Sequence, residues 1–92
     1  MSEHSKTILI VNQRGLHARA SAKFVGAVAE LPEGIAVTID KDGNTAVGGS
    51  ILGLMMLGAA RGDTVELTVS GPDSRAAFER LAALIEDGFG EE

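Results

Sequence analysis

A strict alternation of apolar and polar side chains over residues 64–70 constrains the fold of this chain most strongly. Three apolar side chains fall on one side of an extended backbone, and the two polar ones between them fall on the other. These are Val65, Leu67 and Val69 on the first side and Glu66 and Thr68 on the second. The pattern is typical of a strand in an antiparallel sheet that has one face in water and the other covered. The rest of the chain must then supply further strands, and helices that cover one face.

Two long segments have apolar residues at helical spacing. The first begins at Ala18, and Pro32 with Gly34 ends it. The second begins near Ser74, after a proline, and Gly88 ends it. The positions expected on the buried faces are Ala20, Phe24, Val28 and Leu31 in the first helix and Phe78, Leu81, Ala82 and Ile85 in the second.

Three further segments predict strands and one predicts a short helix. The strands are expected at residues 6–11, 35–40 and 45–47, with a hairpin turn at residues 41–44. Ser50 is placed to cap a short helix that ends near Gly58. The resulting order, βαββαβα, predicts the α+β class and an open-faced β-sandwich. We expect a single domain over residues 1–92, with residues 1–5 and 89–92 frayed.

The composition argues against several classes of protein. The 92 residues can build one modest core, and the absence of cysteine excludes disulfides and thiolate metal sites. The first residues do not resemble a signal peptide, and the longest apolar run, residues 51–60, is too short for a membrane span. We therefore expect a cytoplasmic protein without membrane insertion. A net charge of −5 and the absence of Trp and Tyr argue against nucleic acid as a partner.

The charge is unevenly distributed along the chain. Residues 1–23 hold four basic side chains and one acidic one, a net charge of +3. Residues 24–92 hold four basic and twelve acidic side chains, a net charge of −8, and the two parts sum to −5. The basic part contains His17, so this portion of the chain suits a site that handles an anion.

His17 stands where the first helix is expected to begin. The first N–H groups of a helix have no intrahelical partner, and they favour an anion. The same field disfavours a protonated imidazole, so we expect the neutral, nucleophilic ring. With Arg19 two residues further on, His17 could accept a phosphoryl group and Arg19 could hold its oxygens. From these residues alone, an ordinary surface histidine remains the simpler interpretation.

The segment Gly-Leu-His-Ala-Arg, residues 15–19, with Ala-Ser-Ala-Lys-Phe-Val after it, closely resembles the active-site segment of the histidine-containing phosphocarrier family, HPr. That family carries phosphoryl groups in the bacterial phosphoenolpyruvate-dependent phosphotransferase system. The resemblance covers nearly the whole chain. It implies a four-stranded antiparallel sheet with three helices on one face.

The resemblance also implies a mechanism. Nδ1 of His17 would accept the phosphoryl group from phosphorylated enzyme I, and the group would pass to sugar-specific or regulatory enzyme II A components. The backbone N–H groups of Ala18 and Arg19 and the Arg19 side chain would stabilise it. Such a protein is a carrier rather than an enzyme, and we expect it to be a monomer without cofactor or metal.

Ser50 begins a second informative segment. By itself Ser50 is explained as an N-cap, which contributes roughly 1 kcal/mol. The glycine-rich stretch before it lacks the lysine of a nucleotide-binding P-loop. The run Ser-Ile-Leu-Gly-Leu-Met, residues 50–55, also matches the segment around the regulatory serine of HPr proteins. That match implies phosphorylation of Ser50 by an ATP-dependent HPr kinase/phosphorylase. Gly49 stands where a lysine is frequent in the family and Met56 where a serine is frequent, so a local cation is missing.

The short helix after Ser50 has apolar residues on more than one side. Ile51, Leu54 and Met55 are expected to form one inward stripe, whereas Leu52 and Met56 fall on another side. Leu52 and Met56 belong either to the core or to an exposed patch that fits several partners. The candidate docking residues are Leu52, Met55 and Met56.

Other functions compete with the carrier. A nitrogen-branch paralogue uses the same histidine chemistry for regulation rather than sugar uptake, and the active-site segment does not separate the two. A relative that only binds partners would lack His17, and an enzyme would need a cleft with further polar groups. Metal binding by His4 and His17 is not expected because other ligands at suitable spacing are missing. We expect His4 to be inert.

Overall fold

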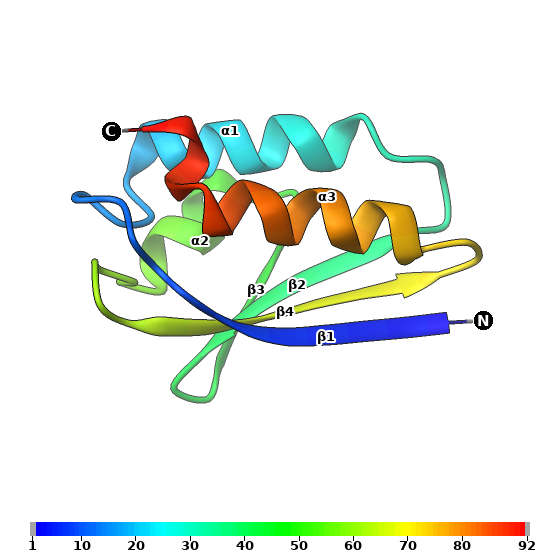
Figure 1. The fold of residues 1–92 in the computed structure, drawn as a ribbon, viewed down its shortest axis with the longest axis horizontal. Coiled ribbons are helices and arrows are strands. Elements are labelled where there is room, and N and C mark those ends of the chain that lie inside the picture. Colours follow the sequence, from blue (N-terminus) through cyan, green and yellow to red (C-terminus); the bar gives the residue numbers. More distant parts are fainter. Residues whose placement is uncertain (1, 92) are drawn as a thin grey trace.

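The computed structural model describes residues 2–91, within which four strands form one antiparallel sheet in the order β1-β4-β2-β3. The elements are β1 (Ser2–Leu9), α1 (Ala18–Ala29), β2 (Ala36–Lys41), β3 (Asn44–Val47), α2 (Ile51–Met56), β4 (Thr64–Gly71), α3 (Arg75–Glu86) and a 3-10 turn (Gly88–Gly90). All three α-helices cover the same face of the sheet (Figure 1). The predicted α+β open-faced sandwich, its element order and its antiparallel sheet are confirmed.

The alternation in β4 fixes which face is covered. Val65, Leu67 and Val69 are buried, at 2%, 0% and 0% exposure, and they lie in one core with residues from all three helices. The opposite face is polar, and there the hydroxyl groups of Ser5 and Thr68 lie 3.1 Å apart across β1 and β4. Each residue thus goes to the face that its polarity predicts.

The helices contribute the expected apolar faces with small differences. The buried helical residues are Ala20, Ser21 and Phe24 of α1, Leu54 of α2, and Ala77, Leu81, Ala82 and Ile85 of α3. Val28, Leu31 and Phe78 pack against this core but are only partly buried. Within residues 2–91, no helix is both long and apolar enough to cross a membrane.

The hairpin between β2 and β3 has a two-residue loop, as the polar turn at residues 41–44 predicts. Its central residues, Asp42 and Gly43, have φ values of 51° and 85°. Positive φ at both positions is the type I′ geometry, which matches the twist of the two strands. The presence of glycine at position 43 is therefore explained by the positive φ that the turn requires, and no ligand-binding role is needed to explain it.

The prediction that residues 1–5 are frayed is wrong for residues 2–5. β1 begins at Ser2 rather than Lys6, and it pairs with β4 along eight residues, from Ser2 opposite Gly71 to Leu9 opposite Thr64. A polar stretch can form an edge strand because its backbone N–H and C=O groups are satisfied by the neighbouring strand. Met1 lies outside the described residues.

The prediction that residues 89–92 are frayed is wrong for residues 89–91. Phe89 is 1% exposed and lies in the core cluster, although its φ of 59° is unusual for a residue other than glycine. Burial of an aromatic ring stabilises the turn against the cost of that backbone conformation. Glu92 lies outside the described residues.

Candidate functional site

His17 is the N-cap of α1, at the helix start that the sequence predicts. Its backbone is extended, with φ −76° and ψ −177°, and its carbonyl accepts the first helical hydrogen bond, from Ser21 N–H at 2.9 Å. The ring caps the helix as well, because Nδ1 accepts a hydrogen bond from the backbone N–H of Arg19 at 3.3 Å. Since a backbone N–H can only donate, Nδ1 carries its lone pair and no proton.

The loop before His17 is tightly anchored, which fixes where the ring can lie. Gly15 has a φ of +61°, and a Cβ there would lie 2.2 Å from the carbonyl oxygen of Ala59. Leu16 N–H donates to that same oxygen at 3.0 Å, and the buried Asn12 side chain donates to the carbonyl of Gly15 at 2.8 Å. Any side chain at position 15 would push this loop away from residue 59, so glycine is needed here.

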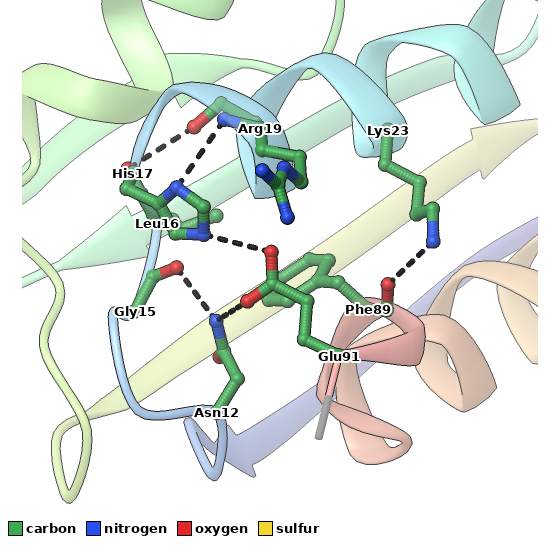
Figure 2. Close-up of polar contacts among 9 residues, drawn as sticks. Asn12, Gly15, Leu16, His17, Arg19, Lys23, Phe89 and Glu91 are labelled. Carbon is green, nitrogen blue, oxygen red and sulfur yellow. Dashed lines mark hydrogen bonds and ion pairs between the residues drawn. The ribbon is translucent and has the colours of Figure 1, made fainter.

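The second ring nitrogen of His17 contacts Glu91, a residue that the sequence analysis did not single out. Nε2 lies 2.8 Å from Oε2 of Glu91, and the other carboxylate oxygen accepts a hydrogen bond from Asn12 Nδ2 at 3.0 Å (Figure 2). With Nδ1 as acceptor, the ring proton lies on Nε2 and is donated to the carboxylate. Glu91 is 74 positions away from His17, in a segment expected to be frayed, so no local signal pointed to it.

The surroundings of Glu91 keep it ionised. Its pKa lies below the ordinary value for glutamate, chiefly because Asn12 donates a hydrogen bond to the carboxylate. Burial acts in the opposite direction, and the hydrogen bond from His17 and the charge of Arg19 lower the pKa further. Near neutral pH the site therefore contains one carboxylate that accepts hydrogen bonds from Asn12 and His17.

The residues around His17 line a shallow hollow of about 320 Å³. Its lining residues are Gln13, Arg14, His17, Arg19, Lys23, Gly90 and Glu91. Three of them are cationic, as the basic charge of residues 1–23 predicts. Arg19 is exposed, with its guanidinium beside Glu91, while the Lys23 ammonium group donates to the carbonyl of Phe89 at 2.9 Å (Figure 2). Such a hollow suits an anion with several oxygens.

Ser50 caps α2 as predicted. Its Oγ accepts a hydrogen bond from the backbone N–H of Gly53 at 2.9 Å, and the residue is half-buried. A Cβ on Gly53 would lie 3.0 Å from that oxygen, so the glycine gives the cap its room. α2 packs beside α1, which carries His17 at its start (Figure 1).

The expected inward stripe of α2 is only partly correct. Leu54 is fully buried, but Ile51 and Met55 are 41% and 40% exposed. Leu52 and Met56 are 67% and 77% exposed, so the alternative that they belong to the core is wrong. A helix of six residues that crosses the end of a small core can bury little more than one side chain, and the other apolar residues remain on the surface.

His4 does not take part in this site. It lies in β1, where its ring stacks on Phe78 with centroids 5.4 Å apart. Within residues 2–91, no group of three or more His, Cys, Asp or Glu side chains is arranged to hold a metal ion.

Comparison with known proteins identifies the family. A family model described as "PTS HPr component phosphorylation site" matches residues 4–87. The chain belongs to the HPr family. The HPr phosphocarrier protein of Neisseria meningitidis serogroup A is 43% identical over 86 residues, covering 94% of each chain. That of Cupriavidus necator is 43% identical over 82 residues, covering 89% of this chain and 90% of the relative.

Solved structures agree with this assignment. HPr-C-His from Thermoanaerobacter tengcongensis superposes with a TM-score of 0.87 at 38% identity, covering 97% of this chain and 98% of the other. An HPr from Bacillus anthracis gives a TM-score of 0.83 at 32% identity, covering 92% and 99%. The resemblance that the His17 segment suggested is thus confirmed. HPr proteins are phosphocarriers of the phosphotransferase system rather than catalytic enzymes, so this assignment favours the carrier interpretation over an enzyme.

Proposed function

We propose that this HPr accepts a phosphoryl group on Nδ1 of His17 from phosphorylated enzyme I and passes it to a sugar-specific or regulatory enzyme II A component. The main support is the placement of the His17 ring at the N-terminus of α1, with an unprotonated Nδ1 directed at the N–H of Arg19. A nucleophilic nitrogen and an anion-binding helix end thus coincide at one point of the surface.

The transfer needs little more than position and charge. The lone pair of Nδ1 attacks phosphorus, and the new N–P bond forms as the bond from phosphorus to the donor breaks. Nδ1 can then no longer accept the hydrogen bond from Arg19 N–H, which becomes free to bind a phosphoryl oxygen together with the N–H of Ala18. The guanidinium of Arg19 neutralises the remaining charge. Because that side chain is exposed, it can release the phosphoryl group to the next protein.

The exposed apolar residues of α2 suit the docking of partner proteins. Leu52, Met55 and Met56 form the proposed docking patch, and Ile51 extends it. Methionine side chains adapt to surfaces of different shape, as a carrier with several partners requires. We propose that the carrier acts as a monomer in the cytoplasm, with this patch covered only during docking.

Ser50 is the proposed second phosphorylation site. A phosphoryl group there would carry about two negative charges into the N-terminus of α2 and next to exposed Leu52. The helix end tolerates the charge, but an apolar partner surface does not, so docking would weaken. The modifying enzyme would be an HPr kinase/phosphorylase, and it would act without a lysine at position 49.

Intact-mass spectrometry tests the carrier function. The protein is incubated with enzyme I, magnesium and phosphoenolpyruvate, beside the variant His17→Ala. We expect one added phosphoryl group that is lost in mild acid and is absent from the variant. If the native chain gains no adduct while an authentic HPr is labelled in parallel, the proposed function is wrong.

A second transfer step distinguishes the sugar branch from the nitrogen branch. The phosphorylated protein is mixed with a sugar-specific enzyme II A component and, separately, with a nitrogen-branch one, and the rate of phosphoryl transfer is compared. We expect faster transfer to the sugar-specific component, because the Ser50 segment resembles that of the sugar carriers. Preferred transfer to the nitrogen-branch component would assign the chain to that branch.

A further inference from the structure

We propose that Glu91 is a positioning residue for His17, whose carboxylate holds the ring proton on Nε2 and stabilises the positive charge that the ring gains when Nδ1 binds phosphorus. This inference rests on the proposed function of His17. It assigns a role in phosphoryl transfer to a residue far outside the Gly15–Val25 segment that carries the histidine.

The contact between Glu91 and His17 is short and partly sheltered from water. Nε2 and Oε2 are 2.8 Å apart, and the two side chains are only 15% and 19% exposed. Asn12 fixes the carboxylate from its other side, because its Nδ2 donates both to Oε1 of Glu91 and to the carbonyl of Gly15. The loop that orients His17 therefore orients Glu91 as well (Figure 2).

The segment that carries Glu91 is built to hold it in place. Phe89 is buried in the core, and Lys23 of α1 donates to the Phe89 carbonyl at 2.9 Å. Gly88 and Gly90 have φ values of 66° and 74°, and a Cβ on Gly90 would lie 2.9 Å from the Lys23 ammonium nitrogen. Two glycines and one buried aromatic ring thus turn the chain back toward the start of α1.

The chemistry of the transfer gives this carboxylate a function. Before transfer the ring is neutral, with a proton on Nε2 and a lone pair on Nδ1. When the lone pair forms the N–P bond and the donor bond breaks, the ring keeps its Nε2 proton and becomes cationic. Glu91 lies next to that proton and offsets the charge. When the phosphoryl group leaves, the electron pair returns to Nδ1 and the ring is neutral again.

Repulsion between Glu91 and the phosphoryl oxygens would oppose this effect. The carboxylate contacts Nε2, whereas the phosphoryl group is attached at Nδ1 on another edge of the ring. The guanidinium of Arg19 lies beside the carboxylate, where it can offset the repulsion (Figure 2). A carboxylate paired with a histidine in this way is known to orient the ring and to stabilise its cationic form in hydrolases.

Two measurements on the full chain test the inference. The rate constant for phosphoryl acceptance from phosphorylated enzyme I is measured for Glu91→Gln, Glu91→Ala and the control Glu33→Gln, which removes an exposed carboxylate beyond the other end of α1. Nitrogen-15 NMR of the His17 ring, without any phosphoryl donor, reports which nitrogen carries the proton and how fast that proton exchanges with water.

We expect both Glu91 variants to accept the phosphoryl group about tenfold more slowly than the native chain, and Glu33→Gln to match the native rate. The Gln side chain is nearly isosteric, so a purely structural role would leave Glu91→Gln at the native rate, and that result would overturn the inference. In the native chain we expect an Nε2 proton protected from exchange, and in Glu91→Ala an exchanging one. An equal exchange rate in both would show that Glu91 does not hold the Nε2 proton in solution, and it would overturn the inference.

The two proposals fail in different ways. If the native chain has the protected Nε2 proton but takes up no phosphoryl group from enzyme I, the proposed function of His17 is wrong and Glu91 has no transfer to assist. If the native chain is phosphorylated and Glu91→Gln is phosphorylated equally fast, the carrier function stands and the role of Glu91 is wrong.

Discussion

Arg19 makes the most direct prediction at the scale of single residues. It is exposed on the first turn of α1, beside the carboxylate that contacts His17 (Figure 2). Replacing it by Gln removes the cation expected to neutralise the phosphoryl oxygens, so the rate constant for phosphoryl acceptance should fall by about 100-fold. Arg19→Lys should recover part of the loss, because lysine keeps the charge but not the planar fork of donors.

Rapid mixing with phosphorylated enzyme I, stopped with base and followed by intact mass, measures these rate constants. Arg61→Gln is the matched control, since it removes an exposed arginine that does not line the hollow. Equal rates for Arg19→Gln and the native chain would show that backbone N–H groups alone stabilise the transfer.

His4 makes a prediction about stability rather than function. Its Nε2 is buried and has no hydrogen-bond partner among residues 2–91, while its ring stacks on Phe78. His4→Phe keeps an aromatic ring there and removes the unpaired polar atom, so the free energy of unfolding should rise by about 1 kcal/mol. Urea unfolding measures the change, with Glu3→Gln as an exposed control on the same strand. A lower free energy of unfolding for His4→Phe would mean that the nitrogen is satisfied in solution.

The single residues also show how far the sequence alone can predict this site. His17 could be placed at a helix start because the polar turn before it and the apolar period after it are local signals. Asn12 and Glu91 could not be predicted, because their roles depend on a contact between two ends of the chain. A buried asparagine in a turn and a glutamate in a glycine-rich segment have no signature until the fold brings them together.

At the scale of elements, α2 separates the capping role of Ser50 from its proposed regulatory role. Ser50→Ala removes the hydrogen bond from Gly53 N–H, and the free energy of unfolding should fall by about 1 kcal/mol. Ser50→Asp keeps a capping oxygen and places a negative charge at the helix N-terminus, so it should be about as stable as the native chain. Yet it should receive phosphoryl groups more slowly, because the charge lies beside the exposed patch of α2.

Urea unfolding gives the free energies of unfolding of Ser50→Ala and Ser50→Asp from the midpoint concentrations, provided that the dependence of the free energy on urea concentration is unchanged. The phosphoryl-transfer assay gives the rate constants of the same two variants. Thr45→Ala, which alters an exposed position on β3 before the cap, serves as the control for transfer. If Ser50→Asp receives phosphoryl groups as fast as Ser50→Ala and the native chain do, a negative charge at this position does not regulate the docking of partner proteins.

The elements themselves were largely predictable, and the exceptions have one cause. Apolar and polar residues alternate in β4 and β2 because each strand has one buried face and one face exposed to water. Apolar residues recur at helical spacing in α1 and α3 because each helix packs on the sheet. Residues 2–5 and 89–91 were mispredicted because their structure comes from tertiary partners. The first segment is an edge strand paired to β4, and the second is held by one buried phenylalanine.

At the scale of the whole molecule, folding changes the charge distribution that the sequence suggests. The basic first quarter of the chain meets acidic residues from its last part. Lys6 forms an ion pair with Glu86 at 2.5 Å, and Glu91 reaches the hollow around His17. The site is therefore not a uniformly cationic surface. It is a cationic hollow that also contains one carboxylate, and a carrier that must release its phosphoryl group can use such a mixed field.

The docking of residues 88–91 should depend on pH because Glu91 helps to hold them. The pKa of Glu91 is lowered in the folded chain, mainly by the hydrogen bond from Asn12. The packed position of residues 88–91 therefore favours the ionised form of Glu91. The resulting stabilisation is fully present above the ordinary glutamate pKa of about 4.3 and is lost as pH falls through the lower, folded value. Acidification should thus release this segment, and NMR signals of the Gly88 and Gly90 amides and the Phe89 ring should shift together as the pH falls below the ordinary glutamate value of about 4.3.

Glu91→Gln is the control for this titration, because an amide cannot be protonated in that range. In that variant the Gly88, Phe89 and Gly90 signals should keep one position across the same pH window. The sheet should remain intact during the release in the native chain, since Val65, Leu67 and Val69 are buried without a titratable group among them. If the three signals shift equally in Glu91→Gln, another group holds the segment. The link between Glu91, the end of α3 and the start of α1 would then be incorrect.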